Sequence, residues 1–263
     1  MIIVEFLGNL SQRNYPLFVF GSINLVSAAI FIFLPLFSKI NVGGVNAWFK
    51  PFKFCASVGI FSWTMAWFTY SIHEPYSIHL FNWAIIILLG FENIYISIQA
   101  ARGVNSHFNF TTKFSTILFQ IMGLAAAIVA LWTGYIGIIL GGSQTENLPD
   151  YYIMSIRLGI LLFVIFAFEG AAMGARSSHS VGEKEGGSFI PVLNWSRQYG
   201  DLRIAHFIGM HALQVLPIMA WYVFKNSIGT LILSLFYGLL AFYTLRMALK
   251  GQAPFIKKKL KEA

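Results

Sequence analysis

Apolar residues recur along the chain in seven long runs, separated mostly by short polar connections. Each run has about 20 residues or more, the length that an α-helix needs to cross the hydrocarbon core of a bilayer. No linker long enough to separate two domains lies between the runs, so we expect one integral-membrane domain over residues 1–263. The predicted membrane-spanning helices cover residues 15–37, 48–72, 77–101, 113–140, 152–175, 202–224 and 227–249.

The composition agrees with this pattern. Apolar residues make up 57% of the chain and charged residues only 11%, whereas a soluble domain has about 25% charged residues. Such a chain has too little polar surface to coat a soluble globule. The single cysteine, Cys55, excludes an internal disulfide and a cysteine-based metal cluster. We therefore predict an all-α membrane protein folded as a seven-transmembrane-helix bundle.

The basic residues predict the orientation of this bundle. Of the 18 lysines and arginines, 15 fall on one side of the seven alternating spans, and only Arg13, Arg157 and Lys225 fall on the other. The positive-inside rule then puts the N-terminus outside and the C-terminus in the cytoplasm, as expected for a bacterial inner (cytoplasmic) membrane. The basic tail over residues 250–263 is expected to contact the anionic lipids of the cytoplasmic leaflet, not nucleic acid.

Polar residues inside the predicted spans share helix faces and are weighted toward the cytoplasmic half. Charged side chains in a membrane span are costly and usually face the bundle interior, so we expect one polar cavity that opens to the cytoplasm. The outer half shows no comparable set. Span by span, the residues are Lys50, Lys53, Ser57 and Thr64; Glu92, Tyr95, Gln99 and Arg102; Lys113, Thr116 and Gln120; Glu169 and Arg176; and Arg203, His206, His211 and Gln214.

Structural roles account for part of this set. Lys113 can extend its ammonium group to the lipid headgroups. Ion pairs of Glu92 with Lys53 and of Glu169 with Arg203 would neutralise the two carboxylates without any function. Asp201 is a suitable N-cap for the span that begins at residue 202.

Metal binding is one chemistry open to these residues, because histidine and carboxylate groups are ligands of zinc and non-haem iron. The candidate ligands of a divalent metal are His206, His211, His107 and Glu92. His206 and His211 differ by about 140° around a helix, so they do not form a chelating pair. A b-type haem is the less favoured cofactor, because only the span over 202–224 has histidines well inside it.

The favoured hypothesis is a membrane-embedded enzyme that acts on a lipid or another amphiphilic anion. Glu92, Glu169, His206 and His211 would bind a metal or perform general acid–base catalysis. Two alternatives remain: a proton-coupled organic-anion transporter or channel, and a haem-binding electron carrier. The residues expected to bind the lipid or small-molecule ligand are Lys50, Lys53, Gln99, Arg102, Gln120, Arg203 and Gln214.

Several known seven-helix and membrane-enzyme motifs are absent. The last span has neither the Schiff-base lysine of microbial rhodopsins nor the H-x-x-x-H of ceramidase-like hydrolases, and the chain has no H-x-x-H-H box. An internal similarity is present instead. Residues 91–108 and 168–181 both contain F-E, then A-R, then S-H, which suggests a parallel repeat of helix pairs.

Overall fold

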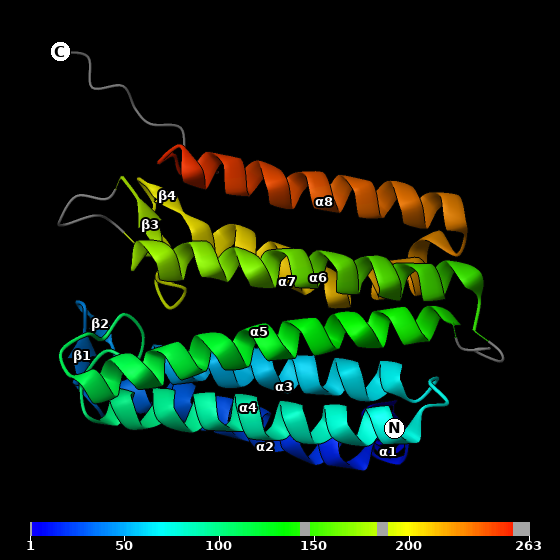
Figure 1. Ribbon diagram of the computed structural model, residues 1–263, viewed down its shortest axis with the longest axis horizontal. Coiled ribbons are helices and arrows are strands. Elements are labelled where there is room, and N and C mark those ends of the chain that lie inside the picture. The colour runs from blue at the N-terminus through cyan, green and yellow to red at the C-terminus, as the bar shows by residue number, and fades with distance from the viewer. Residues whose placement is uncertain (1, 143–147, 183–188, 255–263) are drawn as a thin grey trace. The chain divides into compact units, whose positions relative to one another are not determined.

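The computed structural model describes residues 2–142, 148–182 and 189–254, and these residues are mainly helical (Figure 1). The basic tail beyond residue 254 lies outside this range. The helices are α1 (Ile2–Arg13), α2 (Tyr15–Phe33), the 3-10 turn η1 (Leu34–Leu36), α3 (Phe49–Thr69), α4 (Pro75–Ala101), α5 (Lys113–Gly142), α6 (Asp150–Arg176), α7 (Leu202–Met219), the π-helical turn η2 (Ala220–Phe224) and α8 (Ser227–Leu249). Four two-residue strands, β1 (Asn41–Val42), β2 (Val45–Asn46), β3 (Ser180–Val181) and β4 (Gly200–Asp201), pair as β1–β2 and β3–β4.

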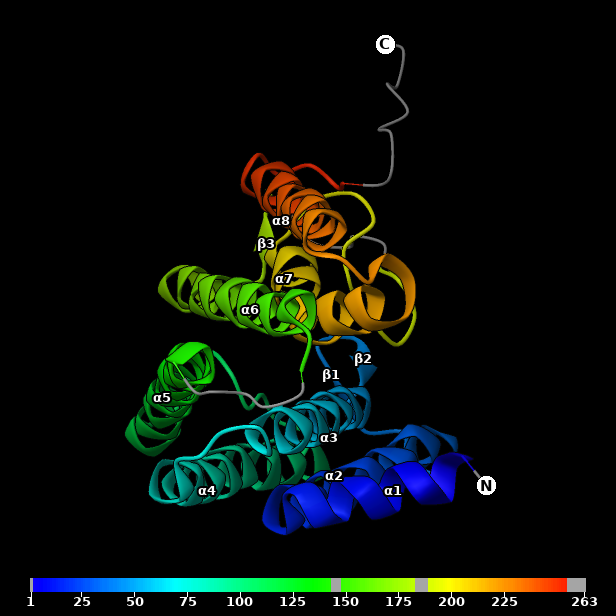
Figure 2. The same ribbon diagram turned by 90° about the vertical axis from the view of Figure 1, so that its right-hand side faces the viewer.

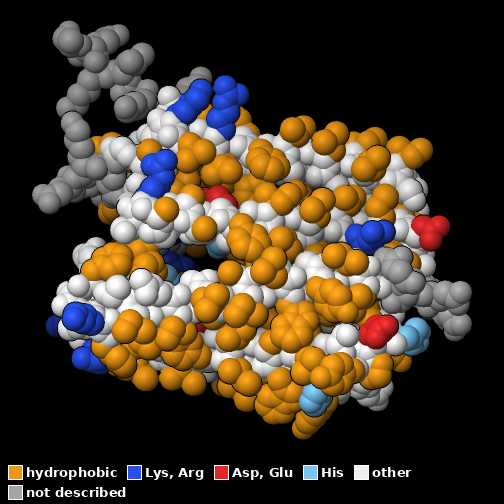
Figure 3. Space-filling model, viewed as in Figure 1, with side chains coloured by type: hydrophobic (Ala, Val, Ile, Leu, Met, Phe, Trp, Pro, Cys, Tyr) orange, Lys and Arg blue, Asp and Glu red, His pale blue; other side chains and the backbone are white. Residues whose placement is uncertain are grey.

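Six helical segments of the described residues are long and apolar enough to cross a membrane, which indicates an integral membrane protein. They comprise α2 with η1, α4, α5, α6, α7 with η2, and α8. Large hydrophobic side chains cover much of the helix surface seen in Figure 3, as expected where lipid replaces water.

The seventh predicted span, α3, is a helix of 21 residues but is not one of these six. Lys50 and Lys53 near its start, together with polar residues along its length, lower its hydropathy. The count of seven membrane spans and the orientation of the chain therefore stay predictions.

The sequence interpretation missed helix α1. This helix has only 12 residues, too few to cross a bilayer, so a search for long apolar runs passes over it. Leu10 is fully buried, whereas Ile3 and Val4 are about three-quarters exposed. Asn14 separates α1 from α2 and caps α2 by accepting a hydrogen bond from the Leu17 backbone N–H.

The chain folds as two compact units, Met1–Leu148 and Pro149–Ala263, each with its own set of packed helices. In unit 1, α2, α3 and α4 all contact one another, α1 packs on α2 and α3, and α5 packs on α4. In unit 2, α6, α7 and α8 all contact one another, as the view in Figure 2 shows. The predicted single domain over residues 1–263 stays a prediction.

Hydrogen-bonded asparagines show that α2 and α4 run in the same direction. Asn14, just before α2, pairs with Asn82, and Asn24 pairs with Asn93. The first residues of these two pairs are ten apart and the second are eleven apart, which is about three helical turns in each case. Because the pairs advance together along both helices, α2 and α4 are parallel, as the alternating topology requires.

The part of unit 1 from α2 to α4 and the whole of unit 2 share an order of elements: a helix, a pair of short strands, and two further helices. The helices on either side of the strand pair, α2 with α3 and α6 with α7, cross at small residues. A Cβ added to Gly59 of α3 would lie 3.1 Å from the Gly21 carbonyl oxygen of α2, and one added to Gly159 of α6 would lie 2.9 Å from the Ala212 carbonyl oxygen of α7. In the order of elements, α2–α3–α4 therefore corresponds to α6–α7–α8. This differs from the predicted repeat, which matched α4 with α6.

Candidate functional site

Glu169 of α6 is a buried carboxylate without a hydrogen bond, unlike Asp201, the other buried carboxylate among the described residues of unit 2. The Glu169 side chain is 6% exposed, and neither carboxylate oxygen has a hydrogen-bond partner. The nearest cationic group is His206 of α7, whose Nδ1 lies 3.5 Å from Oε2. An ionised carboxylate in such surroundings costs several kcal/mol unless a charge partner compensates. Among the described residues, His206 is therefore the group placed to compensate a charge on Glu169.

The α6–α7 interface holds His206 in this position. Its Nδ1 donates a hydrogen bond of 2.6 Å to the Phe166 carbonyl oxygen, one turn before Glu169. Gly170 leaves space for the imidazole, because a Cβ at that position would lie 3.4 Å from His206 Cε1. The His206 side chain is 30% exposed. Because the Phe166 carbonyl oxygen accepts the Nδ1 proton, Nδ1 lies beside the Glu169 carboxyl group without a hydrogen bond to it.

His211 and Gln214 lie further along α7 and contact each other. The Nδ1 of His211 is 3.1 Å from the Gln214 side-chain oxygen, and its ring centroid lies 4.2 Å from that of Phe207, with the two rings tilted by 59°. No group of three His, Cys, Asp or Glu side chains that could hold a metal is found among the described residues. His107 and Glu92 belong to unit 1 and His206 and His211 to unit 2, so the predicted ligands do not gather within either unit.

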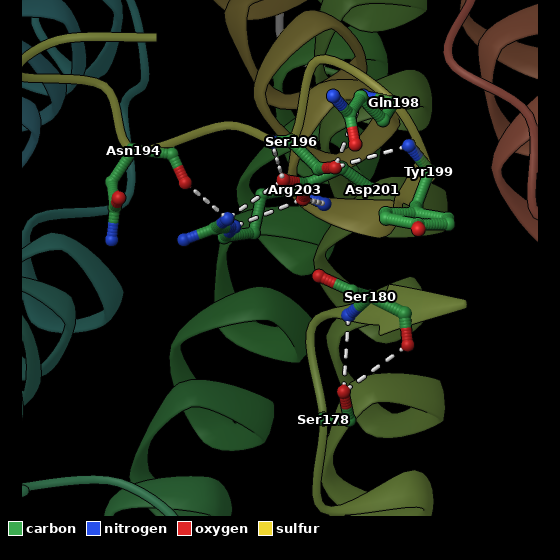
Figure 4. Close-up of polar contacts among 8 residues, drawn as sticks. All are labelled: Ser178, Ser180, Asn194, Ser196, Gln198, Tyr199, Asp201 and Arg203. Carbon is green, nitrogen blue, oxygen red and sulfur yellow. Dashed lines mark hydrogen bonds and ion pairs between the residues drawn. The ribbon is translucent and has the colours of Figure 1, made fainter. Parts of the chain in front are cut away.

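Arg203 is engaged by Asp201 and not by Glu169, which corrects one of the two expected ion pairs. Figure 4 shows this contact at the entry to α7. The Nε and Nη2 atoms of Arg203 lie 2.9 and 2.7 Å from the two carboxylate oxygens of the fully buried Asp201. Nη2 also donates to the Asn194 carbonyl oxygen. These bonds occupy the guanidinium that was expected to hold an anionic ligand.

Asp201 organises the segment that precedes α7. It accepts hydrogen bonds from the backbone N–H groups of Ser196 and Arg203, and the latter confirms the expected N-cap. Gly200 beside it is required by close packing, since a Cβ there would lie 2.0 Å from the Ala248 carbonyl oxygen of α8. The polar contacts of this segment therefore position α7 and, with it, His206.

Unit 1 contains a second glutamate–histidine pair. Glu92 of α4 is buried, and its Oε1 lies 3.7 Å from Nε2 of His107, which follows α4. On the other side of the imidazole, Lys50 of α3 lies 3.1 Å from Nδ1. An ammonium group can only donate, so Nδ1 accepts from Lys50, and the ring proton of neutral His107 is on Nε2, facing Glu92. The three residues form a chain of polar contacts, Glu92–His107–Lys50.

The remaining predicted ligand-binding residues of unit 1 have different surroundings. Gln99 is buried and donates a 2.8 Å hydrogen bond to the Tyr95 hydroxyl, while its own side-chain oxygen has no hydrogen-bond partner. Lys53 is half-buried. Gln120 and Arg102 are exposed, so their placement gives no support to the expected polar face on α5 or to a buried role for Arg102.

The sequence interpretation missed a set of buried amides in unit 1. Asn14 Nδ2 donates to both the Asn82 side-chain oxygen and the Thr69 hydroxyl, at 3.0 Å each, and Asn82 Nδ2 donates back to Asn14 at 3.1 Å. These groups lie at the end of α3 opposite Lys50. The expectation that this half lacks buried polar groups is therefore wrong for unit 1, because uncharged asparagines were not counted beside the charged residues.

The buried polar groups of α4 extend along most of that helix. Asn82, Glu92, Asn93 and Gln99 are all buried. From Asn82 to Gln99 the helix rises about 25 Å, close to the thickness of a hydrocarbon core. Unit 1 therefore has buried polar groups near both ends of α4, separated by the buried apolar residues Ile85 and Leu89.

No protein-family model, curated protein or solved structure matches this chain.

Proposed function

We propose that the protein is a proton-coupled transporter of a small organic anion, with Glu169 and His206 as the proton-exchanging pair. The observation that carries the proposal is the Glu169 carboxyl group, which is buried without a hydrogen bond beside a partly exposed histidine. Ionisable groups placed in this way inside a membrane serve as proton relays in transporters.

Two further features support transport. Both units contain a triad of mutually packed helices with short paired strands between the first and second helix, and internal repeats are a common construction of transporter folds. Buried polar groups near both ends of α4 also favour transport, because a transported anion needs polar groups in both halves of the membrane. Lys53 and Arg102 are the basic residues we expect to attract the anion.

The test uses proteoliposomes that contain the pH-sensitive dye pyranine. Lactate, succinate or glycerol 3-phosphate is applied as a concentration gradient, and internal pH is recorded. We expect at least one of these anions to move protons with wild-type protein and to lose that effect with Glu169→Gln. Anion-driven proton movement by Glu169→Gln at the wild-type rate would refute the assignment of Glu169. Glu5→Gln, at an exposed position on α1, is the matched control.

A membrane-embedded enzyme acting on a lipid is the second candidate, and the Glu92–His107–Lys50 chain favours it. A histidine oriented by a carboxylate is a common general base. The protein would be incubated with fluorescent phosphatidylglycerol and the products separated by mass spectrometry. The enzyme account requires turnover by wild-type protein and its loss in His107→Ala. An unchanged lipid, or equal turnover by the variant, would exclude this role for His107.

A further inference from the structure

Arg13, the last residue of α1, has a guanidinium group that makes no hydrogen bond to any residue that the structure describes. No hydrogen bond or ion pair of the described residues involves this side chain. Its Cζ atom lies 3.8 Å from the centroid of the Trp67 ring and 4.7 Å from that of Tyr70. These aromatic rings fix the guanidinium in place, while all five of its N–H donors stay unused.

A hollow of about 330 Å³ adjoins this guanidinium in unit 1. Its walls come from the end of α1, the end of α3, the following turn and the start of α4. Two of the lining residues, Thr69 and Asn82, belong to the cluster of buried amides around Asn14. The lining residues are Arg13, Thr69, Tyr70, Ile72, Pro75, Ile78, His79 and Asn82.

The chemistry of this hollow favours an oxyanion. A guanidinium presents a planar set of donors that matches phosphate and carboxylate groups. Its flat face is held by Trp67 and Tyr70, so little side-chain freedom is lost on binding. None of the three ion pairs among the described residues lies at this hollow, so no described carboxylate already occupies the guanidinium.

We propose that the hollow beside Arg13 is a binding site for a phosphate-type oxyanion, either a lipid headgroup or a free organic phosphate. The site is distinct from the Glu92–His107–Lys50 chain. Lys50 and Thr69 are near opposite ends of α3, about 28 Å apart along the helix axis. The proposal does not depend on the transport function, because it follows from the contacts of Arg13 alone.

The test measures two phosphate probes on protein in phosphatidylcholine nanodiscs. Glycerol 3-phosphate is titrated by calorimetry, and retention of added phosphatidylglycerol is followed by native mass spectrometry. We expect at least one probe to bind, with affinity at least tenfold weaker in Arg13→Gln and intermediate in Arg13→Lys, which keeps the charge but loses the planar fork. Arg157→Gln, at an exposed arginine of α6, is expected to bind like wild type.

The two probes separate the sources of the oxyanion. Binding of glycerol 3-phosphate indicates a free organic phosphate, and retention of phosphatidylglycerol alone indicates a lipid headgroup. The proposal is overturned when neither probe binds wild-type protein, or when Arg13→Gln binds both probes as wild type does.

A second measurement on the wild-type protein covers the case in which Arg13→Gln does not fold. Phenylglyoxal modifies arginine side chains, and peptide mass spectrometry locates the adducts. Saturating glycerol 3-phosphate or phosphatidylglycerol should slow adduct formation at Arg13 and leave the rate at Arg157 unchanged. Equal rates at Arg13 with and without both probes would also overturn the proposal.

Discussion

Replacing Gly209 by alanine is expected to disrupt the α6–α7 interface that positions His206. The added Cβ would lie 2.0 Å from Cγ and 2.4 Å from Cβ of Phe166, whereas carbon atoms in contact are normally about 3.5–4.0 Å apart. Phe166 is fully buried and its overlapping atoms are close to its backbone, so the helices themselves must separate. Overpacking of this kind costs about 1–3 kcal/mol.

Gly174→Ala is the matched control for this substitution. Gly174 is also in a helix of unit 2, and a Cβ there meets no atom within 4 Å. Both substitutions gain about 0.5–1 kcal/mol from the higher helix propensity of alanine, so that contribution cancels. The two variants should therefore differ by about the overpacking cost alone, 1–3 kcal/mol.

Thermal unfolding in detergent, followed by far-ultraviolet circular dichroism, measures this difference. We expect Gly209→Ala to unfold several degrees below Gly174→Ala, because about 1 kcal/mol corresponds to 2–4 °C for a chain of this size class. Equal unfolding temperatures for the two variants would refute the described packing of Phe166 against Gly209 and, with it, the placement of His206.

Two further predictions concern the buried polar contacts. Asn82→Leu removes both hydrogen bonds between Asn82 and Asn14 and should destabilise the protein by about 1–2 kcal/mol in detergent unfolding. Ser97→Ala, which loses only a bond to its own helix backbone, should change stability little. Asp201→Ala leaves the guanidinium of Arg203 without its carboxylate, so the segment before α7 should loosen and trypsin should cleave there faster than in wild type. Unchanged cleavage would contradict the role of Asp201 in ordering that segment.

The helices could be predicted from the sequence because a long apolar run in a membrane must satisfy its own backbone hydrogen bonds, which it does as an α-helix. All seven predicted ranges coincide with helices to within a few residues, including the extension of the 202–224 run through η2. The short amphipathic helix α1 could not be found by the same criterion. The paired strands β1–β2 and β3–β4 have two residues each, too few for an alternating pattern.

The burial of the two glutamate side chains could be predicted from the sequence, but their partners could not. Glu92 and Glu169 are buried as expected, because a carboxylate in a long apolar helix is costly in contact with lipid and usually faces the protein interior. The residues that contact these two glutamates are brought there by loops and helix crossings, which the spacing of polar residues along a helix does not reveal. His107 contacts Glu92 from the segment after α4, and Asp201, the N-cap of α7, forms an ion pair with Arg203.

Infrared difference spectroscopy of the pH response tests the central claim, that Glu169 and His206 exchange a proton, most directly. A carboxylic acid group has a carbonyl stretching band separate from those of amides and carboxylates. We expect wild-type protein to show a band in that region that changes with pH, that is absent from Glu169→Gln, and whose titration midpoint moves in His206→Gln. The same pH-dependent band in Glu169→Gln and wild type would contradict the account.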